Sequence, residues 1–386
     1  GYYLSHTDTG QLIDSNAFDA GFGLASDYGL DTYTTRIDDF NDVNRVDIGY
    51  HYSEGLPRYI LDVNIVEDLN DPGIHGYVLP DPNRPYYFEG DTVTLTAYPD
   101  DAAPNYFLQG WYDANDLLLG VGRTLDVVMD WHKFIRVRFR QGKKILVSGG
   151  GPALRDAVNA AENGDTLVVI AGTYDGNIDF GGKEIRVMSA NPDDPNIVAR
   201  TIIDGGSVTR GFIFANGEGR DALLNGVTIT NSGGIPGESG GAIYIDANSS
   251  PTIVNVSISN CNVVSASGGA IYINSNNNPK FINVDITSCS SDGGNGGGIY
   301  LADYSVATFL YVTITDCRAI GGSGGAVFCN LETTTIFDKC EFADNYAGSF
   351  GGGLYVSDNG ATSLSECVFT GNTADIDAGA ARFDAN

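Results

Sequence analysis

The chain has 386 residues, of which 49 are acidic and 21 are basic, so its formal net charge is −28 at pH 7. This charge argues against a nucleic-acid partner, because a phosphate backbone would be repelled, and it favours divalent cations and neutral or cationic partners. Hydrophobic residues make up 42% of the chain, yet no stretch approaches the roughly 20 apolar residues of a membrane helix. We therefore expect a folded, acidic protein of two or three domains without membrane insertion.

The first segment, residues 1–55, is rich in Asp and in turn-forming residues, and includes TTRIDDFNDVNRVDIGYHY. Its candidate calcium ligands are Asp38, Asp39, Asp42, Asn44 and Asp47. They match no complete calcium loop, because EF-hand spacing requires a Gly and a terminal Glu that are missing here. A solvated loop is the alternative, so we expect either no cofactor or calcium. The segment resembles the tail that closes the β-helix in large modular bacterial extracellular proteins.

Residues 56–141 are predicted to form a small β domain with its own core, of a β-sandwich or β-grasp-like type. Apolar residues alternate with threonines in residues 92–97 and with arginines in residues 135–139. This alternation is typical of strands with one buried face. The sequence EGDTVTLTAYPD, followed by GWYD and the arginine-containing strand, resembles the divergent internalin B-repeat of bacterial surface proteins. The resemblance implies a spacer or adhesive module without catalysis.

The third segment, residues 142–386, is predicted to begin with a helical cap at about residues 151–163. Pro152 suits a first helical turn, and Asn163–Gly164 suits a helix end. The apolar face of this helix consists of Leu154, Ala157, Val158 and Ala161. We predict that this face covers the open end of a β core, whose strands continue through TLVVIAGTY, EIRVMSA, TIIDGG and GVTITNS.

An internal repeat organises the rest of the chain. GGAIY at 240 recurs as GGAIY at 268, GGGIY at 296, GGAVF at 324, GGGLY at 351 and AGAAR at 378, a period of 28 or 27 residues. Two inward-facing columns are predicted in this strand: Ile243, Ile271, Ile299, Val327, Leu354 and Ala381, and then Ile245, Ile273, Leu301, Cys329, Val356 and Phe383. The paired glycines predict a corner with φ > 0, where a Cβ is penalised.

Further apolar columns follow in each coil: Ile253, Phe281, Phe309, Phe337 and Leu364, then Val256, Val284, Val312, Cys340 and Cys367. Each coil is thus expected to supply about three short strands. Because no helical period interrupts the coils, we predict a parallel β-helix in which like residues stack at roughly 4.8 Å.

These coils resemble right-handed parallel β-helix proteins of the pectate-lyase-like superfamily, and their GG(A/G)(I/L)Y motifs are similar to the repeats of bacterial polymorphic outer-membrane proteins. The resemblance covers about residues 143–386. It implies the fold but no activity, since the same solenoid carries lyases, hydrolases, adhesins and inert stalks. The predicted fold class is all-β, a right-handed parallel β-helix preceded by the small β module.

An outward position is aromatic in five coils: Tyr244, Tyr272, Tyr300, Phe328 and Tyr355. An exposed aromatic stripe at coil spacing suits stacking on sugar rings or lateral contact with another subunit. The alternative is mutual stacking that stabilises the sheet.

The six cysteines show no CxxC or zinc spacing. Cys261, Cys289 and Cys317 share one column, continued by Asn345 and Asn372, whereas Cys340 and Cys367 share another. In-register neighbours point the same way, which suits disulfide geometry poorly. We therefore predict stacked, buried thiols.

Catalytic residues are sparse in the repeat. All four histidines, His6, His51, His75 and His132, precede it, which argues against polygalacturonase-type hydrolysis. A lyase needs an Arg or Lys base beside acidic groups. The coil residues Lys280, Arg318, Lys339 and Arg382 occupy different offsets, whereas a lyase site around Arg186, Arg200, Asp204 and Arg210 stays open.

We therefore expect a non-enzymatic structural or adhesive segment of a bacterial extracellular or cell-surface protein. Its β-helix would be a rigid rod that self-associates laterally or head-to-tail into a fibre, sheath or surface layer. The alternative is a polysaccharide-binding or polysaccharide-lyase β-helix. The 386 residues are expected to be one window of a longer modular chain, or to have the open end at Asn386 completed by the N-terminus of another copy.

Overall fold

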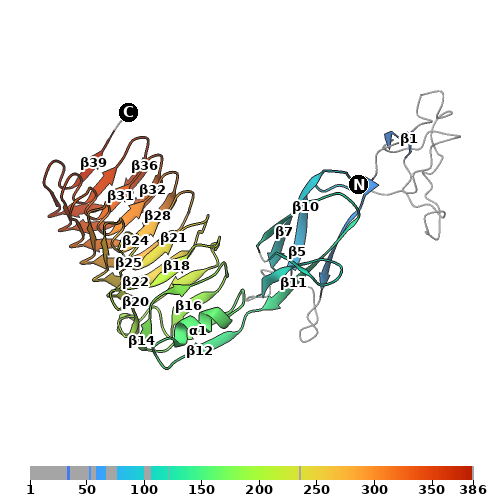
Figure 1. Cartoon of the computed structure of the whole chain (residues 1–386), viewed down its shortest axis with the longest axis horizontal. Coiled ribbons are helices and arrows are strands. Elements are labelled where there is room, and N and C mark those ends of the chain that lie inside the picture. The colour runs from blue at the N-terminus through green and yellow to red at the C-terminus, as the bar shows by residue number, and fades with distance from the viewer. Residues whose placement is uncertain are drawn as a thin grey trace. The chain divides into compact units, whose positions relative to one another are not determined.

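A computed structural model (Figure 1) describes residues 33–34, 52–53, 58–66, 76–99, 106–120, 122–233 and 236–384. The chain divides into two compact units, Gly1–Arg140 and Gln141–Asn386. In the first unit, β1 (Tyr33–Thr34) pairs antiparallel with β2 (Tyr52–Ser53), and β3 (Arg58–Tyr59) pairs antiparallel with β6 (Tyr87–Phe88).

Two larger sheets form the core of the first unit. A three-stranded sheet has the order β10 (Thr124–Val128), β7 (Thr92–Pro99), β5 (Gly76–Asp81). A four-stranded sheet has the order β4 (Leu61–Val66), β11 (Lys133–Gln141), β8 (Tyr106–Tyr112), β9 (Leu118–Gly120). Val93, Leu95 and Ala97 of the first sheet share a buried core with Ile135, Val137 and Phe139 of the second. The predicted alternation in these strands is confirmed.

The second unit is a parallel β-helix. Its eight-stranded sheet contains the GGAIY strands and their upstream equivalents: β15 (Ile178–Asp179), β18 (Phe212–Phe214), β21 (Ile243–Ile245), β24 (Ile271–Ile273), β27 (Ile299–Leu301), β31 (Val327–Cys329), β35 (Leu354–Val356) and β39 (Ala381–Phe383). Each strand pairs in parallel with the next, and identical repeat positions are register partners. The predicted like-on-like stacking is therefore confirmed.

A 15-stranded sheet supplies two further strand columns. The first contains β12 (Lys144–Val147), β13 (Thr166–Val169), β16 (Arg186–Ser189), β19 (Leu223–Asn225), β28 (Val306–Leu310), β32 (Thr334–Asp338) and β36 (Ala361–Ser365). The second contains β14 (Gly172–Asp175), β17 (Thr201–Asp204), β20 (Thr228–Thr230), β29 (Thr313–Thr315), β33 (Glu341–Ala343) and β37 (Val368–Thr370). The long strands β22 (Thr252–Ser259) and β25 (Lys280–Thr287) belong to both columns.

A fourth strand column corrects the prediction of about three strands per coil. It is a five-stranded sheet of β23 (Asn262–Val264), β26 (Ser290–Asp292), β30 (Arg318–Ala319), β34 (Tyr346–Ala347) and β38 (Thr373–Ala374). These strands are only two or three residues long. Each of the first four buries one residue, Val263, Ser291, Ala319 or Ala347, which is too few for a visible alternation.

The helix α1 (Ala153–Ala160) lies inside the range predicted for the cap. Its residues Leu154 and Val158 are fully buried in the β-helix core, and the helix packs against β12, β13, β14 and β15. In Figure 1 it lies beside β12, at the end of the solenoid where the coils begin. A four-residue helix, α2 (Pro195–Val198), was not predicted, and the Asp194 side chain caps it by accepting from the backbone N–H of Asn196 at 2.9 Å.

The paired glycines meet two different requirements. Gly268 has φ +69°, as predicted for the corner, and the first glycine of the four other GG motifs also has positive φ. A Cβ on the second glycine, Gly269, would lie 2.2 Å from the carbonyl oxygen of Gly297 in the next coil. The first glycine thus permits the turn, and the second permits the close approach of neighbouring coils.

The last described coil contains edge strands. β36, β37, β38 and β39 each end their strand columns. Leu364 and Phe383 belong to columns that are buried in earlier coils, yet 39% and 51% of their surfaces are exposed here. Within the described residues this end therefore differs from the first coil, whose core is covered by α1.

Candidate functional site

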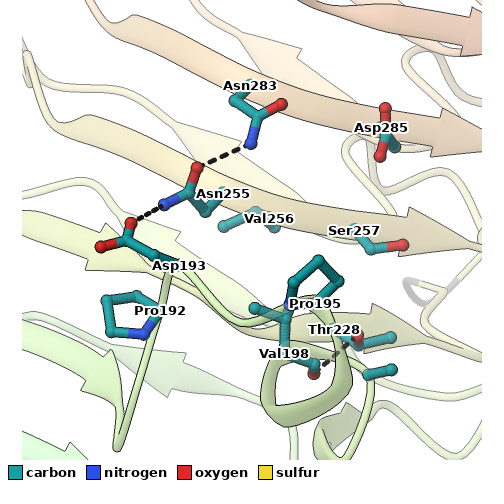
Figure 2. A pocket seen from close by; sticks show the side chains of 11 residues that line it. Pro192, Asp193, Pro195, Val198, Thr228, Asn255, Val256, Ser257, Asn283 and Asp285 are labelled. Atoms are coloured by element: carbon teal, nitrogen blue, oxygen red, sulfur yellow. Dashed lines mark hydrogen bonds between the residues drawn. The ribbon is translucent and has the colours of Figure 1, made fainter.

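A cleft of about 520 Å³ lies on the outer surface of the β-helix. It lies between the segment that includes α2 and the outer faces of β20, β22 and β25 (Figure 2). Its lining residues are Pro192, Asp193, Pro195, Val198, Ala199, Thr228, Asn255, Val256, Ser257, Asn283 and Asp285. The cleft therefore extends over three successive coils.

The floor of the cleft follows from the strand period. Val256 is buried, so its neighbour Ser257 faces outward, and Asp285 occupies the register position of Ser257 one coil on. Asn255 and Asn283 both have φ +51° at the bend between the two strand columns. Asn tolerates this left-handed conformation better than most residues.

Side-chain hydrogen bonds connect these coils (Figure 2). Asn283 Nδ2 donates to Asn255 Oδ1 at 2.7 Å, and Asn255 Nδ2 donates to Asp193 Oδ1 at 3.1 Å. Thr228 Oγ1 donates to the carbonyl oxygen of Val198 at 3.0 Å, which ties the α2 segment to the sheet. These bonds therefore hold the α2 segment against the sheet at two points along the cleft.

The lining combines two carboxylates, Asp193 and Asp285, with amide and hydroxyl groups and a wall of proline and valine. Among the described residues, no basic side chain lines it. This arrangement suits hydrogen bonding to a neutral or cationic polar ligand and opposes a polyanion. The cleft was not predicted from the sequence. The only signal for it was NPDDPN, residues 191–196, which has no counterpart in the repeat.

The predicted aromatic stripe is a continuous ladder. Centroids of successive rings from Tyr244 to Tyr272, Tyr300, Phe328 and Tyr355 are 5.7, 5.1, 5.2 and 4.8 Å apart, with interplanar angles of 2–9°. The expectation that the stripe is exposed is wrong. The four tyrosines are half-buried and Phe328 is buried, because each ring lies against those of adjacent coils.

Charged groups flank both ends of this aromatic ladder. The guanidinium of Arg210 lies 4.4 Å from the ring centroid of Tyr244, and the Tyr244 hydroxyl donates to Asp246 at 2.8 Å. At the other end the Tyr355 hydroxyl donates to Asp384, which also accepts from Arg382 at 2.7 Å. Burial, together with the carboxylate acceptor, raises the pKa of both terminal tyrosines to about 12. The hydroxyls therefore stay protonated at neutral pH.

All six cysteines are free, and all but Cys367 are buried. The predicted burial of the stacked thiols is thus confirmed for five of the six cysteines. Burial raises the pKa of Cys329 and Cys340 to about 12, and a hydrogen bond with the Cys289 thiol, together with burial, raises the pKa of Cys261 well above its ordinary value. These side chains therefore act as small apolar groups.

Asparagine replaces cysteine in the last two coils of the column that begins at Cys261. Asn345 Oδ1 accepts from the backbone N–H of Cys317 at 2.9 Å, and Asn345 Nδ2 donates to the carbonyl oxygen of Ile314 and to Asn372 Oδ1, each at 2.9 Å. Asn372 Nδ2 donates to the carbonyl oxygen of Phe342 at 2.7 Å. The column thus changes from apolar stacking to a hydrogen-bonded ladder.

The residues of the possible lyase site have separate partners. Arg186 lies in β16, Arg200 donates to the carbonyl oxygen of Asn196 at 3.0 Å, and Asp204 accepts from Asn231 Nδ2 at 2.9 Å. Arg210 pairs with Glu238 at 3.1 Å beside the aromatic ladder. Arg186 lies in β16 and Asp204 in β17, which belong to different strand columns, whereas Arg200 and Arg210 lie in the segments that precede β17 and β18.

The candidate calcium ligands Asp38, Asp39, Asp42, Asn44 and Asp47 lie outside the described residues. Within the described part of the chain no group of three or more His, Cys, Asp or Glu residues is placed to hold a metal ion. A search of the same residues finds no helix with the length and hydrophobicity needed to span a membrane.

Comparison with known protein families identifies the fold of the second unit. Residues 195–383 match the family model described as "Right handed beta helix region". No curated protein matches the chain. A solved structure described as "Structure of PL6 family alginate lyase AlyGC" is similar at 17% identity and a TM-score of 0.30, over 62% of this chain and 40% of that one. By the family match, residues 195–383 form a right-handed parallel β-helix.

Proposed function

We propose that the chain is a non-enzymatic structural or adhesive segment of a bacterial extracellular protein, in which the β-helix is a rigid rod. The observation that carries this proposal is the repetition of stacked side chains inside and outside the coils. Phe281, Phe309 and Phe337 stack inside at 5.0 and 4.7 Å, while the aromatic ladder stacks outside. Repeated ladders stiffen a solenoid, whereas a catalytic centre needs particular groups gathered at one point.

The length of the rod follows from strand spacing. Eight stacked strands in the GGAIY sheet, at about 4.8 Å each, give roughly 40 Å. Each added or deleted coil would change this length by one strand spacing without changing the core. The coils are therefore suited to act as interchangeable spacer units.

Deletion of one complete coil tests the spacer role. Removing residues 296–323 brings Tyr272 into stacking distance of Phe328, so the shortened chain should keep its far-ultraviolet spectrum and one main thermal transition. Removing only residues 296–309 should prevent folding, because the inward columns no longer superpose. Loss of folding in both variants would contradict the spacer role.

Self-association is part of the proposal. Because α1 covers the first coil, we propose that the exposed edges beside Leu364 and Phe383 are covered by the 1–55 segment of a second copy. Such a contact is heterologous and can propagate into a fibre or sheath. Electron microscopy of native material, with both chain termini measured by mass spectrometry, tests it. Isolated particles whose subunits end near Asn386 would overturn this assembly.

Polysaccharide binding is a second candidate function, and the cleft beside α2 is the observation that favours it. Its acidic lining suits neutral or amino sugars. The test compares Asp285→Asn with Thr313→Ala, because Thr313 occupies the same register position one coil on, outside the cleft. Binding of chitosan or dextran that weakens only in the Asp285 variant supports this function. Formation of unsaturated uronides from alginate or polygalacturonate would instead establish a lyase.

A further inference from the structure

The outer face of the four-stranded sheet in the first unit combines aromatic and basic groups. Along β11, Ile135 and Val137 are buried, so Phe134, Arg136 and Arg138 share the opposite face. Phe134 is 57% exposed. An exposed ring and two cations on one strand form an amphipathic surface in a chain whose net charge is −28.

Polar side chains of the neighbouring strand extend this surface. In the parallel register of β4 and β11, Asp62 lies beside Phe134, and Asn64 lies beside Arg136. Both side chains are exposed, and both follow the inward positions of Leu61 and Val63, which pack against the core. The aromatic ring is therefore flanked by hydrogen-bonding groups.

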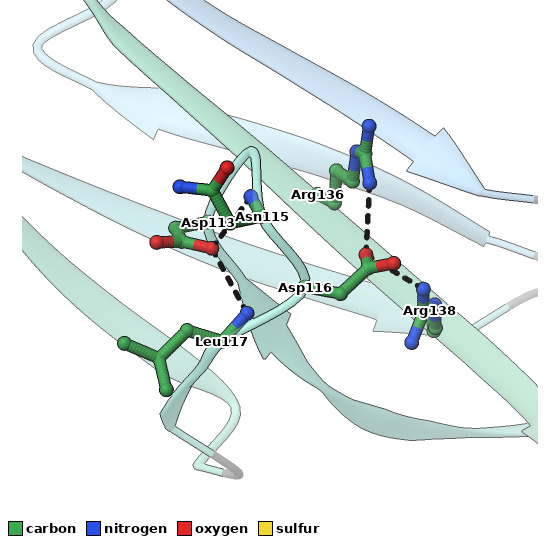
Figure 3. Close-up of polar contacts among 6 residues, drawn as sticks. All are labelled: Asp113, Asn115, Asp116, Leu117, Arg136 and Arg138. Carbon is green, nitrogen blue, oxygen red and sulfur yellow. Dashed lines mark hydrogen bonds and ion pairs between the residues drawn. The ribbon is translucent and has the colours of Figure 1, made fainter.

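A single carboxylate holds the two arginines (Figure 3). Asp116 Oδ1 lies 2.8 Å from Arg136 Nη1 and 2.8 Å from Arg138 Nη2. The hydrogen bonds to both arginines and their charges lower the pKa of Asp116, with the bond from Arg136 as the largest cause. Two cations and one anion leave a charge of about +1 at the arginine pair itself, and Asp62 on the neighbouring strand brings the whole face to about zero. The guanidinium N–H groups that Asp116 does not use can donate to a second anion.

The turn before β9 fixes the position of Asp116. Asp113 Oδ1 accepts from the backbone N–H groups of Asn115 at 2.8 Å and Leu117 at 2.9 Å (Figure 3). Asp116 itself has φ +65°. The Arg138 guanidinium lies 4.4 Å from the ring centroid of Tyr112, which restricts its orientation. The basic pair is thus ordered before any ligand arrives.

The spacing of these groups suits a sugar that carries a carboxylate. Residues two apart on a strand are about 6.8 Å apart, so a pyranose ring on Phe134 can place its carboxylate at Arg136. Asp62 and Asn64 can then bind ring hydroxyls. Aromatic and charged groups lie next to each other on this face, whereas the cores of protein–protein interfaces are depleted of charge.

We propose that this face, formed by Phe134, Arg136 and Arg138 with Asp62 and Asn64, binds the carboxylated sugar units of an acidic polysaccharide. The inference rests on the adhesive role proposed above and extends it to a ligand class. The site lies in the first unit, so it is distinct from the acidic cleft of the β-helix.

The full chain is tested with hyaluronate, its methyl ester and dextran. Wild-type protein should bind hyaluronate, with an affinity that falls as salt rises, and should bind the ester and dextran at least about tenfold more weakly. Phe134→Ala, and Arg136→Gln combined with Arg138→Gln, should each weaken binding about tenfold. Tyr304→Ser, at an exposed aromatic residue of the β-helix, is the matched control and should leave binding unchanged.

The Asp116→Asn variant separates ligand binding from structural support. Asn accepts a left-handed backbone well, and the change removes the carboxylate that competes with the ligand. Hyaluronate should therefore bind about threefold more tightly. Equal or weaker binding by a folded Asp116→Asn protein would overturn the site. Loss of hyaluronate binding in the Asp285→Asn cleft variant, but not in the face variants, would also overturn it. If neither the face nor the cleft binds a polysaccharide, both binding proposals fail. The structural role of the β-helix is then tested by the coil deletions alone.

Discussion

The rings of Tyr272 and Tyr300 lie parallel, with centroids 5.1 Å apart and 3° between their planes. The two residues are register partners in adjacent coils of the eight-stranded sheet. Each ring is half-buried by its neighbours, so the contact stabilises the solenoid whether or not a ligand binds along it.

Breaking this aromatic ladder in its middle should destabilise the β-helix. Tyr300→Ser removes stacking on both Tyr272 and Phe328, and we expect a loss of about 2 to 3 kcal/mol in the free energy of unfolding. The exposed Tyr304→Ser should change it by less than about 0.5 kcal/mol. Urea unfolding followed by circular dichroism measures both variants, and equal midpoints would contradict a structural ladder.

The β-helix should lose stability at alkaline pH. Burial raises the pKa of Tyr244, Tyr300 and Tyr355 to about 12, above the ordinary value of about 10. Because the folded chain holds these protons more tightly, their stabilising effect is complete below pH 10 and is lost as the pH rises toward 12. Thermal unfolding between pH 8 and pH 12 tests this sign. Tyr300→Phe keeps the ring stack and should show a shallower decline.

Asn345 should contribute more to stability than the cysteines of its column. Asn345→Ala leaves the N–H of Cys317 and the carbonyl of Ile314 without their side-chain partner, at a cost of about 2 to 3 kcal/mol. Cys289→Ala removes only a small buried thiol and should cost about 1 kcal/mol. Comparable unfolding midpoints for the two variants would show that the amide ladder adds nothing beyond packing.

The thiols should be unreactive in the folded protein. Five of the six are buried, so only Cys367 is expected to react quickly with a thiol reagent at neutral pH. In denaturant without a reductant, mass spectrometry after alkylation should count six labels. A smaller count would reveal a disulfide, and rapid labelling of several native thiols would show that the coils open easily.

The second glycine of a corner should tolerate no side chain. In Gly269→Ala the new Cβ would lie 2.2 Å from the carbonyl oxygen of Gly297 and 2.5 Å from that of Ser290, and both atoms belong to the backbone. We expect a loss of about 3 kcal/mol or more. Gly181→Ala, where φ is +61° but the space is open, should cost only about 1 kcal/mol. Thermal denaturation of the two variants distinguishes steric clash from backbone strain.

The amino-acid sequence by itself determined the repeating part of this protein. Columns such as Ile243, Ile271 and Ile299 recur at coil spacing, and a strand that buries every second residue turns that recurrence into a stacked core. The cap α1 was also predictable from the sequence, because its apolar residues Leu154 and Val158 lie one helical turn apart. The aromatic ladder was located from its spacing, although its burial was not.

Only the tertiary structure decided the features that occur once. The cleft depends on a hydrogen bond between Asn255 and Asp193, and the basic face depends on Asp116 meeting Arg136 across a turn. The partners in each pair have no periodic relation in the chain, so no pattern predicts their contact. The short β23 column was missed for a related reason, since one buried residue per strand leaves no period. Because the coils repeat, the inward-facing positions can be predicted from the sequence alone. A site that occurs once forms only where the folded chain brings unrelated segments together.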